Sequence, residues 1–244
     1  MTTRADVTRL SAAQRRLVTL AQGELTGYFA TLDLTRPEAV RDALLEIVPL
    51  LVREYGDLAS VAAAEWYEEM RPGGGFNARV APAAATEAVQ GSTRAIAGGL
   101  FTDDPALVLG GLAGAVQRHI AYSGRTTIAL NSMRDPLRPR FGRVPTGART
   151  CAWCAMLASR GFVYATARTA GEIADHFHDD CDCQIVSLFD ADASHIEGYD
   201  PDQLFDRYEQ ARAAADSSDP KAIAAAMRRM FPDEFTDGVH EHDA

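Results

Sequence analysis

The chain has 244 residues, of which 47% are apolar and 24% are charged, and its formal net charge is -10. That length allows one or two domains with a sizeable core, and the acidic balance argues against a protein that coats nucleic acid. No apolar run approaches the ~20 residues that a membrane-spanning helix needs, so we expect no membrane association.

The first 130 residues carry apolar side chains at helical spacing, which predicts a domain of bundled long helices. Residues 1–10 have no clear pattern, and we expect a flexible arm there. Ser11 and Gln14 have the spacing of a capping box and open a first helix that ends near Leu32.

A second, longer helix is predicted from Pro37, which suits the first turn because its missing N–H is not needed there, to about Met70. Pro49 lies inside this helix and should kink it. The alternative is two shorter helices that meet at the proline. A third helix is expected from Pro82 to about Phe101.

A fourth helix should begin at Asp104 and Pro105 and continue past Gly124 to Ile128. After it, the character of the sequence changes, and we predict a small α+β cysteine-rich module over residues 131–190. It should contain short strands at 141–144 and 183–188 and a short helix at 154–160.

An acidic helical tail is expected over residues 191–244, with helices that begin at Pro201 and Pro220 and a polar, mobile end from Val239. The predicted fold class is therefore mainly α. It combines an N-terminal helical bundle, a small zinc-knuckle-like module and C-terminal helices.

All four cysteines of the chain lie between residues 150 and 184, which indicates that they meet in space. Cys151 and Cys154 form a C-x2-C turn, the usual first half of a zinc site. His178, Cys181 and Cys183 form a second half, H-x2-C-x-C, with three ligands where two are needed. We predict a structural zinc site formed by four of these five residues, with His178 as the fourth ligand or as support for the ligands.

Further residues near the cysteines, and other chemical uses of the thiols, are weaker alternatives. His176 is a weaker ligand candidate, and Asp179, Asp180 and Asp182 add negative charge near a cation. Two disulfides would also staple the segment, but the absence of a signal-peptide pattern favours a reducing compartment. Buried free thiols are disfavoured by the clustering, and the flanking residues do not fit a thioredoxin-like pair, a haem attachment site or a nucleobase deaminase.

Five arginines precede or begin the first cysteine turn: Arg134, Arg138, Arg140, Arg143 and Arg149. Clustered arginines beside a zinc-type knuckle are suited to contact nucleic-acid phosphates. The alternative is that they pair with the carboxylates of the protein itself or of an acidic partner.

The cysteine-rich segment resembles a known module. Residues 149–157 have the pattern R-T-C-x-W-C-x-x-L, a stretch with Gly161, Phe162 and Tyr164 follows, and the closing H-x2-C-x-C leads into an apolar strand. Over residues 138–188 this combination resembles the C-terminal module of the phage Mu F-like head-morphogenesis proteins.

The resemblance implies a minor capsid protein, made in the host cytoplasm and carried in the virion at the capsid interior or portal. Its implied partners are the portal protein, the major capsid protein or a scaffold protein, with packaged DNA as a further contact. The single lysine, Lys221, in an alanine- and arginine-rich chain suits an actinobacterial phage. Asp179 and Asp180 depart from the family, which commonly has a proline-containing turn there.

Whether the chain is an enzyme stays open, with a non-enzymatic role favoured, because it has no P-loop, G-x-S-x-G, H-E-x-x-H or dinucleotide-binding motif. The enzymatic alternative is a capsid maturation protease. Its available nucleophiles and bases would be Ser132, Ser159 or Ser187 with His119 or His178. A nucleic-acid-binding module built on the cysteine turns and the arginines is a third alternative.

Overall fold

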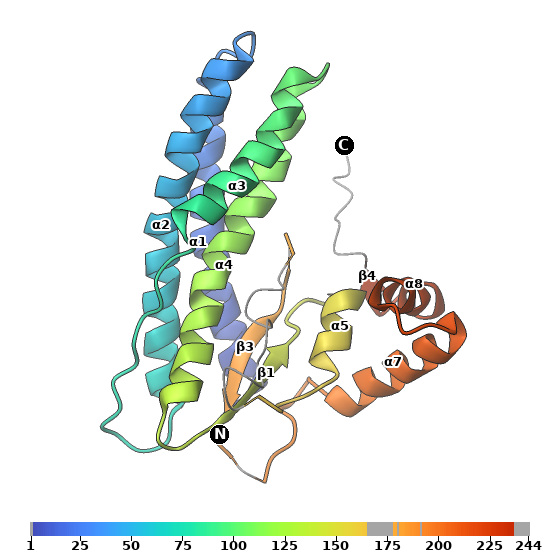
Figure 1. Ribbon diagram of the computed structural model, residues 1–244. Coiled ribbons are helices and arrows are strands. Elements are labelled where there is room, and N and C mark those ends of the chain that lie inside the picture. Colours follow the sequence, from blue (N-terminus) through green and yellow to red (C-terminus); the bar gives the residue numbers. More distant parts are fainter. Residues whose placement is uncertain (1, 165–177, 180, 191, 237–244) are drawn as a thin grey trace.

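Figure 1 shows a computed structural model of the chain, which describes residues 2–164, 178–179, 181–190 and 192–236. This part of the chain is mainly helical, with seven α-helices and two small sheets, as the sequence predicted. The candidates His176 and Asp180 and the expected mobile end from Val239 lie outside the described residues.

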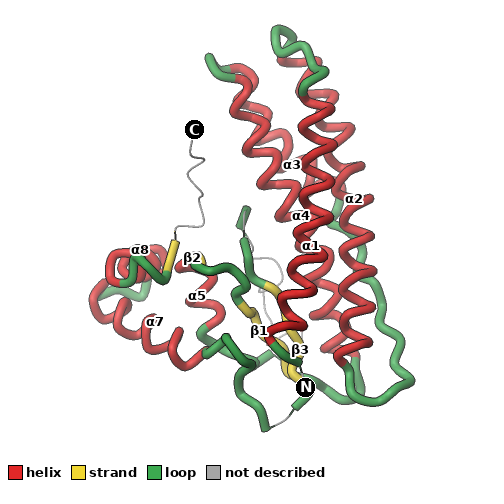
Figure 2. The backbone as a smooth tube through the Cα atoms, turned by 180° about the vertical axis from the view of Figure 1, so that it is seen from behind, coloured by secondary structure: helices red, strands yellow, loops and turns green. Residues whose placement is uncertain are grey.

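The bundle consists of three long helices and one shorter helix that run side by side in both views (Figures 1 and 2). In chain order they are α1 (Arg4–Phe29), α2 (Pro37–Met70), α3 (Thr86–Ala97) and α4 (Val108–Arg134); the 3-10 turns η1 (Gly98–Phe101) and η2 (Pro105–Leu107) connect the last two. α2 packs along α4, and α1 packs against both of them.

α1 begins at Arg4 rather than at Ser11, so the flexible arm expected at the N-terminus is wrong. Thr3 is the N-cap, and it forms a reciprocal capping box with Asp6, whose carboxylate accepts the Thr3 backbone N–H at 2.9 Å. Val7 and Leu10 extend the buried stripe of α1. Residues 4–10 are therefore part of α1 and place Val7 and Leu10 in the core.

α2 is one continuous helix through Pro49, which excludes two shorter helices. The proline has no N–H to donate to the Leu45 carbonyl one turn earlier. Gln90 of α3 donates its side-chain Nε2 to that carbonyl at 3.3 Å. A neighbouring helix thus satisfies the acceptor that Pro49 leaves without its helical partner.

The module is built from two short strand pairs and a short helix. β1 (Arg140–Val144) pairs antiparallel with β3 (Gln184–Leu188), while β2 (Thr150–Cys151) pairs in parallel with β4 (Phe235–Thr236). α5 (Ala152–Ala158) follows β2, and α7 (Pro201–Ala215) and α8 (Pro220–Met230) pack beside it. The two strands and the short helix that the sequence predicted in this module are confirmed.

One hydrophobic core joins the lower bundle to the module. It combines Val7 and Leu10 of α1, Trp66 and Tyr67 of α2 and Ile128 of α4 with Phe141, Ile185 and the four cysteines. A second cluster fills the other half of the bundle, and a third joins α5 to α7 and α8. The expected boundary between residues 130 and 131 falls inside α4.

None of the helices in the described ranges is both long enough and apolar enough to cross a membrane.

Candidate metal centre

The first two cysteines are positioned by the junction of a strand and a helix. Cys151 is the last residue of β2 and the N-cap residue of α5, and Cys154 lies three residues later in the first helical turn. The side chain of an N-cap residue lies beside the third residue of its helix. Both thiols, which are buried, therefore lie near the same point.

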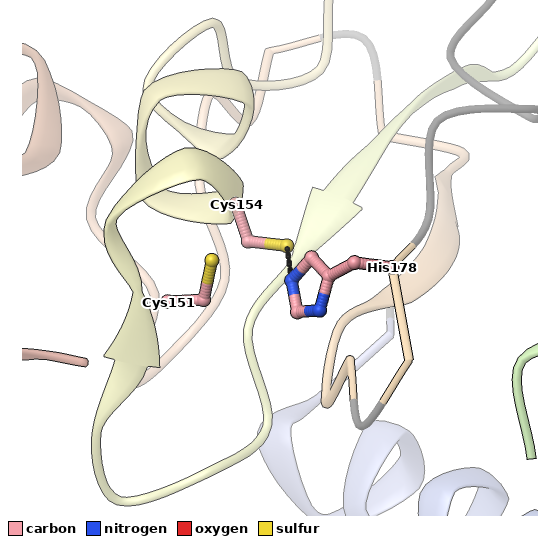
Figure 3. Close-up of side chains that lie close together, drawn as sticks. All are labelled: Cys151, Cys154 and His178. Carbon is pink, nitrogen blue, oxygen red and sulfur yellow. Dashed lines mark hydrogen bonds between the residues drawn. The ribbon is translucent and has the colours of Figure 1, made fainter. Parts of the chain in front are cut away.

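The other three groups reach this point from the segment that leads into β3. Cys154 Sγ lies 3.3 Å from His178 Nε2 and 3.4 Å from Cys181 Sγ. Figure 3 shows Cys154 and His178 pointing toward each other, with Cys151 beside them. The structure thus brings together residues that are far apart in the sequence.

The candidate ligands form two groups of three that share Cys154. One contains Cys151, Cys154 and His178, the other contains Cys154, Cys181 and Cys183, and the ligand atoms within each lie within 4.8 Å of one another. Tetrahedral zinc, with Zn–S bonds of ~2.3 Å, holds sulfur ligands ~3.8 Å apart. The donor types, and the spacing within each group of three, therefore fit a zinc ion. Among the described residues, no four of these ligand atoms all lie within 4.8 Å of one another.

Two buried arginines, each 1% exposed, face the cysteines. Arg125 of α4 donates from Nε to the Cys183 carbonyl at 2.9 Å and from Nη2 to the Cys181 carbonyl at 2.8 Å. Arg143 of β1 places Nη1 3.5 Å from Cys154 Sγ. After the hydrogen bonds with Cys154 and Cys183, the charges of these two arginines also lower the pKa of Cys181, which favours its thiolate, the form that binds metal.

The thiols and the imidazole share protons unequally. The hydrogen bond with Cys154, and then that with His178, lowers the pKa of Cys151 to about 5, while burial opposes this change. Burial would lower the pKa of His178, but the Cys151 thiolate outweighs it and raises this pKa to about 9. Hydrogen bonds with Cys154 and Cys183 lower the pKa of Cys181. Hydrogen bonds with the neighbouring thiols raise the pKa of Cys154, and burial raises that of Cys183. Cys151 and Cys181 are therefore the thiols that ionise most readily, and a bound cation would displace the protons of the other two.

A family model described as VG15 protein matches residues 1–211, and thus both the bundle and the cysteine cluster. The chain belongs to the VG15 protein family. No solved structure matches it.

Two curated relatives of the VG15 chain come from mycobacteriophages, which makes this a family of phage proteins. The "Gene 15 protein" of Mycobacterium phage D29 is 27% identical over 176 residues, covering 54% of this chain and 63% of the relative. The "Gene 15 protein" of Mycobacterium phage L5 is 25% identical over 182 residues, covering 55% of this chain and 62% of the relative. The VG15 chain thus spans less than two thirds of the length of either relative.

Asp179 and Asp182 fix the segment that carries His178, Cys181 and Cys183. The contacts that they make could not be predicted from the sequence. Asp182 Oδ2 accepts the backbone N–H of Thr146 at 3.1 Å and that of Gly147 at 2.6 Å. Asp179 forms an ion pair with Arg118 of α4, with 2.6 Å between Nε and Oδ1. Both carboxylates are therefore engaged in positioning the loops around the cysteines.

Most of the five arginines singled out in the sequence make contacts inside the VG15 chain. Arg134 donates to the Asn77 carbonyl at 2.8 Å, Arg140 to the Ala193 carbonyl at 2.6 Å, and Arg149 to the Phe235 carbonyl at 3.2 Å. Arg143 is buried beside Cys154. Arg138 is exposed, in a left-handed backbone conformation with φ 51°. Four of the five thus act as internal donors to backbone or sulfur atoms.

The serines considered as nucleophiles have partners other than the expected bases. Ser132 and Ser187 hydrogen-bond to each other at 2.6 Å, and Ser159 donates to the Met156 carbonyl at 2.8 Å. His119 instead lies with Nε2 3.1 Å from Ser92 Oγ, and burial, ahead of the Arg118 charge, lowers its pKa to about 4. Within the described residues, none of the three serines is paired with His119 or His178.

Proposed function

We propose that this VG15 protein is a structural component of the phage head, a minor capsid or head-morphogenesis protein that acts at the portal or the inner capsid. The family match supports a phage protein, and the resemblance of residues 138–188 to the Mu F-like module supports the more specific role. The portal protein, the major capsid protein or a scaffold protein would be its partner.

The observation that carries this proposal is that the cysteine cluster connects the helical bundle to the small module with the short strands. The cluster packs in the same core as the ends of α1, α2 and α4. Arg125 and Arg118 of α4 bind the segment that supplies His178, Cys181 and Cys183. Such an arrangement holds the module at a fixed position on the bundle, as an assembly protein that bridges two partners requires.

Zinc is the proposed occupant, held by four of the five groups Cys151, Cys154, His178, Cys181 and Cys183. Thiolate and imidazole ligands suit zinc better than hard cations such as magnesium. When bound, the ion contributes folding free energy, of roughly 10 kcal/mol or more in isolated zinc-finger peptides. The chain supplies the buried thiolates and the arginines that neutralise them.

Contact with packaged DNA is a weaker part of the proposal, because four of the five clustered arginines already donate to groups of the protein itself. Arg138 and Arg149 are the exposed members of the cluster. Arg149 already donates to the Phe235 carbonyl, so Arg138 is the one proposed to contact a phosphate. A role in DNA contact would rest on this residue together with groups on a partner.

The test is a phage that lacks the gene, complemented with wild type or with Cys154→Ser. We expect the deletion to give few filled heads or particles that fail to eject DNA, and wild type to restore them. The cysteine variant should assemble poorly at high temperature if the metal has a structural role. Infectious particles in normal numbers without the gene would remove the head-assembly proposal, while cleaved major capsid protein that depends on a serine of this chain would favour the protease.

A further inference from the structure

The outer side of α2 carries exposed apolar side chains beside carboxylates. Leu50, Leu58 and Val61 are 49%, 48% and 44% exposed, and their spacing of eight and three residues places them on one side of the helix. The exposed Glu54 and Glu65 lie one helical turn from Leu58 and Val61, respectively. We call these five residues the α2 face. The helix that carries it lies on the side of the bundle away from the module (Figure 1).

The outer side of α1 carries an apolar side chain beside arginines. Leu20 is 53% exposed. Arg16 lies one turn before it, and Ala12 and Arg9 continue the same side of the helix; these four residues are the α1 face. Arg9 pairs with Glu69 of its own chain at 2.9 Å. The exposed Arg16, by contrast, forms no hydrogen bond or ion pair within the described part of the chain.

The two faces carry opposite charge. α1 contains four arginines and two carboxylates, whereas α2 contains two arginines and eight carboxylates. The charged members of the α1 face are arginines, and those of the α2 face are glutamates. Opposite charge favours contact between the two faces, and like charge disfavours contact of either face with a copy of itself.

The spacing of the side chains on the two faces also matches. On each face an apolar side chain lies four residues from a charged one, which is ~6 Å along the helix axis. When Leu20 packs on the centre of the α2 face, Arg16 therefore lies level with a glutamate one turn away. This glutamate is Glu54 if the two helices run parallel and Glu65 if they run antiparallel.

We propose that copies of the chain associate with one another, the α1 face of one copy packing on the α2 face of the next. Both faces point out of the same bundle, so they cannot meet within one chain. A two-fold symmetric dimer is disfavoured, because it would bring glutamates against glutamates or arginines against arginines. The contact joins two different surfaces, so it continues from copy to copy and gives a ring or a filament. This self-association does not depend on the role proposed in the phage head.

The test is sedimentation velocity of the full chain under reducing conditions, which exclude disulfide-linked species. We expect species larger than a dimer, in amounts that rise with protein concentration. An increase from ~0.1 M to ~1 M salt shortens the Debye length from about 10 Å to about 3 Å. It should weaken the association by roughly two- to five-fold, as expected for an exposed ion pair.

Two variants each damage one face. Leu20→Asp places a carboxylate in the α1 face, and Leu58→Asp places one among the apolar side chains of the α2 face. Each variant alone should associate at least about ten-fold more weakly than wild type. An equimolar mixture should form a heterodimer that does not grow, because only one pair of faces is intact. The control is Leu107→Asp at the tip of the bundle, where the leucine is 73% exposed, and it should associate like wild type.

Four outcomes would overturn the proposal. They are a wild type that stays monomeric in low salt up to ~1 mM, a wild-type dimer that does not grow, equal weakening by the Leu107 variant, and a mixture of the two damaged variants that stays monomeric. Because the first two are measured on wild-type protein, the proposal is tested even where a variant fails to fold.

Discussion

Cys154 belongs to both groups of candidate metal ligands, so its thiol should matter more than any other. We expect Cys154→Ser to lower zinc affinity by more than the ~10–100-fold that changes around the ligands cost. Cys151→Ser disturbs only one group, and the four remaining candidates still include three cysteines and His178. Its affinity should therefore fall less. Zinc per chain and competition with a chromophoric chelator, under reducing conditions, measure both effects.

The ranking of the two variants separates a metal centre from a cluster of packed thiols. If the thiols bind no metal, zinc will be absent from the wild type and from both variants. The two serine variants would then differ only in how their side chains pack. Equal loss of zinc in both variants would instead show that Cys151 and Cys154 are both required ligands.

Asp135 is the acceptor of a buried network at the lower end of the bundle, and its replacement by asparagine should destabilise the protein. It accepts from Arg71 Nε at 2.7 Å, from the Tyr67 hydroxyl at 3.0 Å and from the Leu137 backbone N–H at 2.9 Å. Loss of charge from a buried, hydrogen-bonded site costs roughly 1–3 kcal/mol. Urea unfolding at pH 7 measures the difference, with Asp57→Asn on the exposed face of α2 as control.

The effect of Asp135 should depend on pH in a defined direction. Burial would raise the pKa of Asp135, but its hydrogen bonds with Arg71, Leu137 and Tyr67 outweigh burial and hold this pKa below its usual value. The stabilisation is therefore complete above the unfolded pKa of ~3.9 and disappears as the pH falls through the lower folded value. The difference in stability between wild type and Asp135→Asn should be constant above pH ~3.9 and should shrink as the pH falls below it. A difference that does not shrink down to the pH at which the protein unfolds in acid would contradict this account.

At this scale, the sequence was informative about short-range spacing. The C-x2-C and H-x2-C-x-C spacing was enough to predict that the five ligand candidates lie near one another, and the structure places them in two groups of three that share Cys154. The residues that support them, such as Arg125 and Arg118, lie in α4, and no local pattern connects them to the cysteines. Asp182 was read as charge near a cation, yet it accepts backbone hydrogens, because its role depends on how the 145–150 loop folds over it.

At the level of elements, two glycine substitutions should change stability in opposite directions. A Cβ at Gly142 of β1 would lie 2.5 Å from the Gly161 carbonyl oxygen, a backbone atom that has no rotamer with which to move away. Gly142→Ala should therefore destabilise the module by roughly 1–3 kcal/mol. At Gly23 of α1 nothing lies within 4 Å, and alanine there should stabilise the protein by ~0.5–1 kcal/mol through helix propensity.

Thermal unfolding of the two alanine variants beside wild type checks this prediction. A Gly142→Ala protein as stable as wild type would mean that β1 can move away from the 161 turn at no cost. A Gly23→Ala protein of lower stability would indicate that the exposed face of α1 is packed against something in solution.

Most helices could be located from their apolar spacing, and the differences have identifiable causes. Gln14 is a buried polar residue in the middle of the stripe of α1, so the apolar pattern appeared to start after it rather than at Val7. Pro49 left two shorter helices open as an alternative to one long α2, and the acceptor that this proline leaves is satisfied by Gln90 from α3. Gln14 lies against Gly124 of α4, and Pro49 depends on Gln90 of α3. Both contacts come from another helix, which spacing within one helix does not show.

On the scale of the whole molecule, the bundle is divided between two hydrophobic clusters. The upper cluster, with Leu25, Leu44 and Leu112, consists of helices alone, while the lower one includes the cysteines. α4 runs through both and also binds the Cys181 and Cys183 carbonyls through Arg125. Metal binding should therefore stabilise α4 against local unfolding, but only in the half of the bundle that shares its core with the module.

Removal of zinc by a chelator under reducing conditions tests this coupling. We expect faster hydrogen exchange in β1, in β3 and in the C-terminal half of α4 around Ile128. Without the ion, the segment with Cys181 and Cys183 is held less firmly, and its hydrogen bonds with Arg125 should open more often. Amides near Leu44 and Leu112 should keep their protection, because their core contains no ligand, and far-ultraviolet circular dichroism should change little. Cys154→Ser without chelator should reproduce the same regional pattern. Uniform loss of protection along all of α4 would mean that the two clusters unfold as one unit, and unchanged exchange in β3 would show that the module is held without metal.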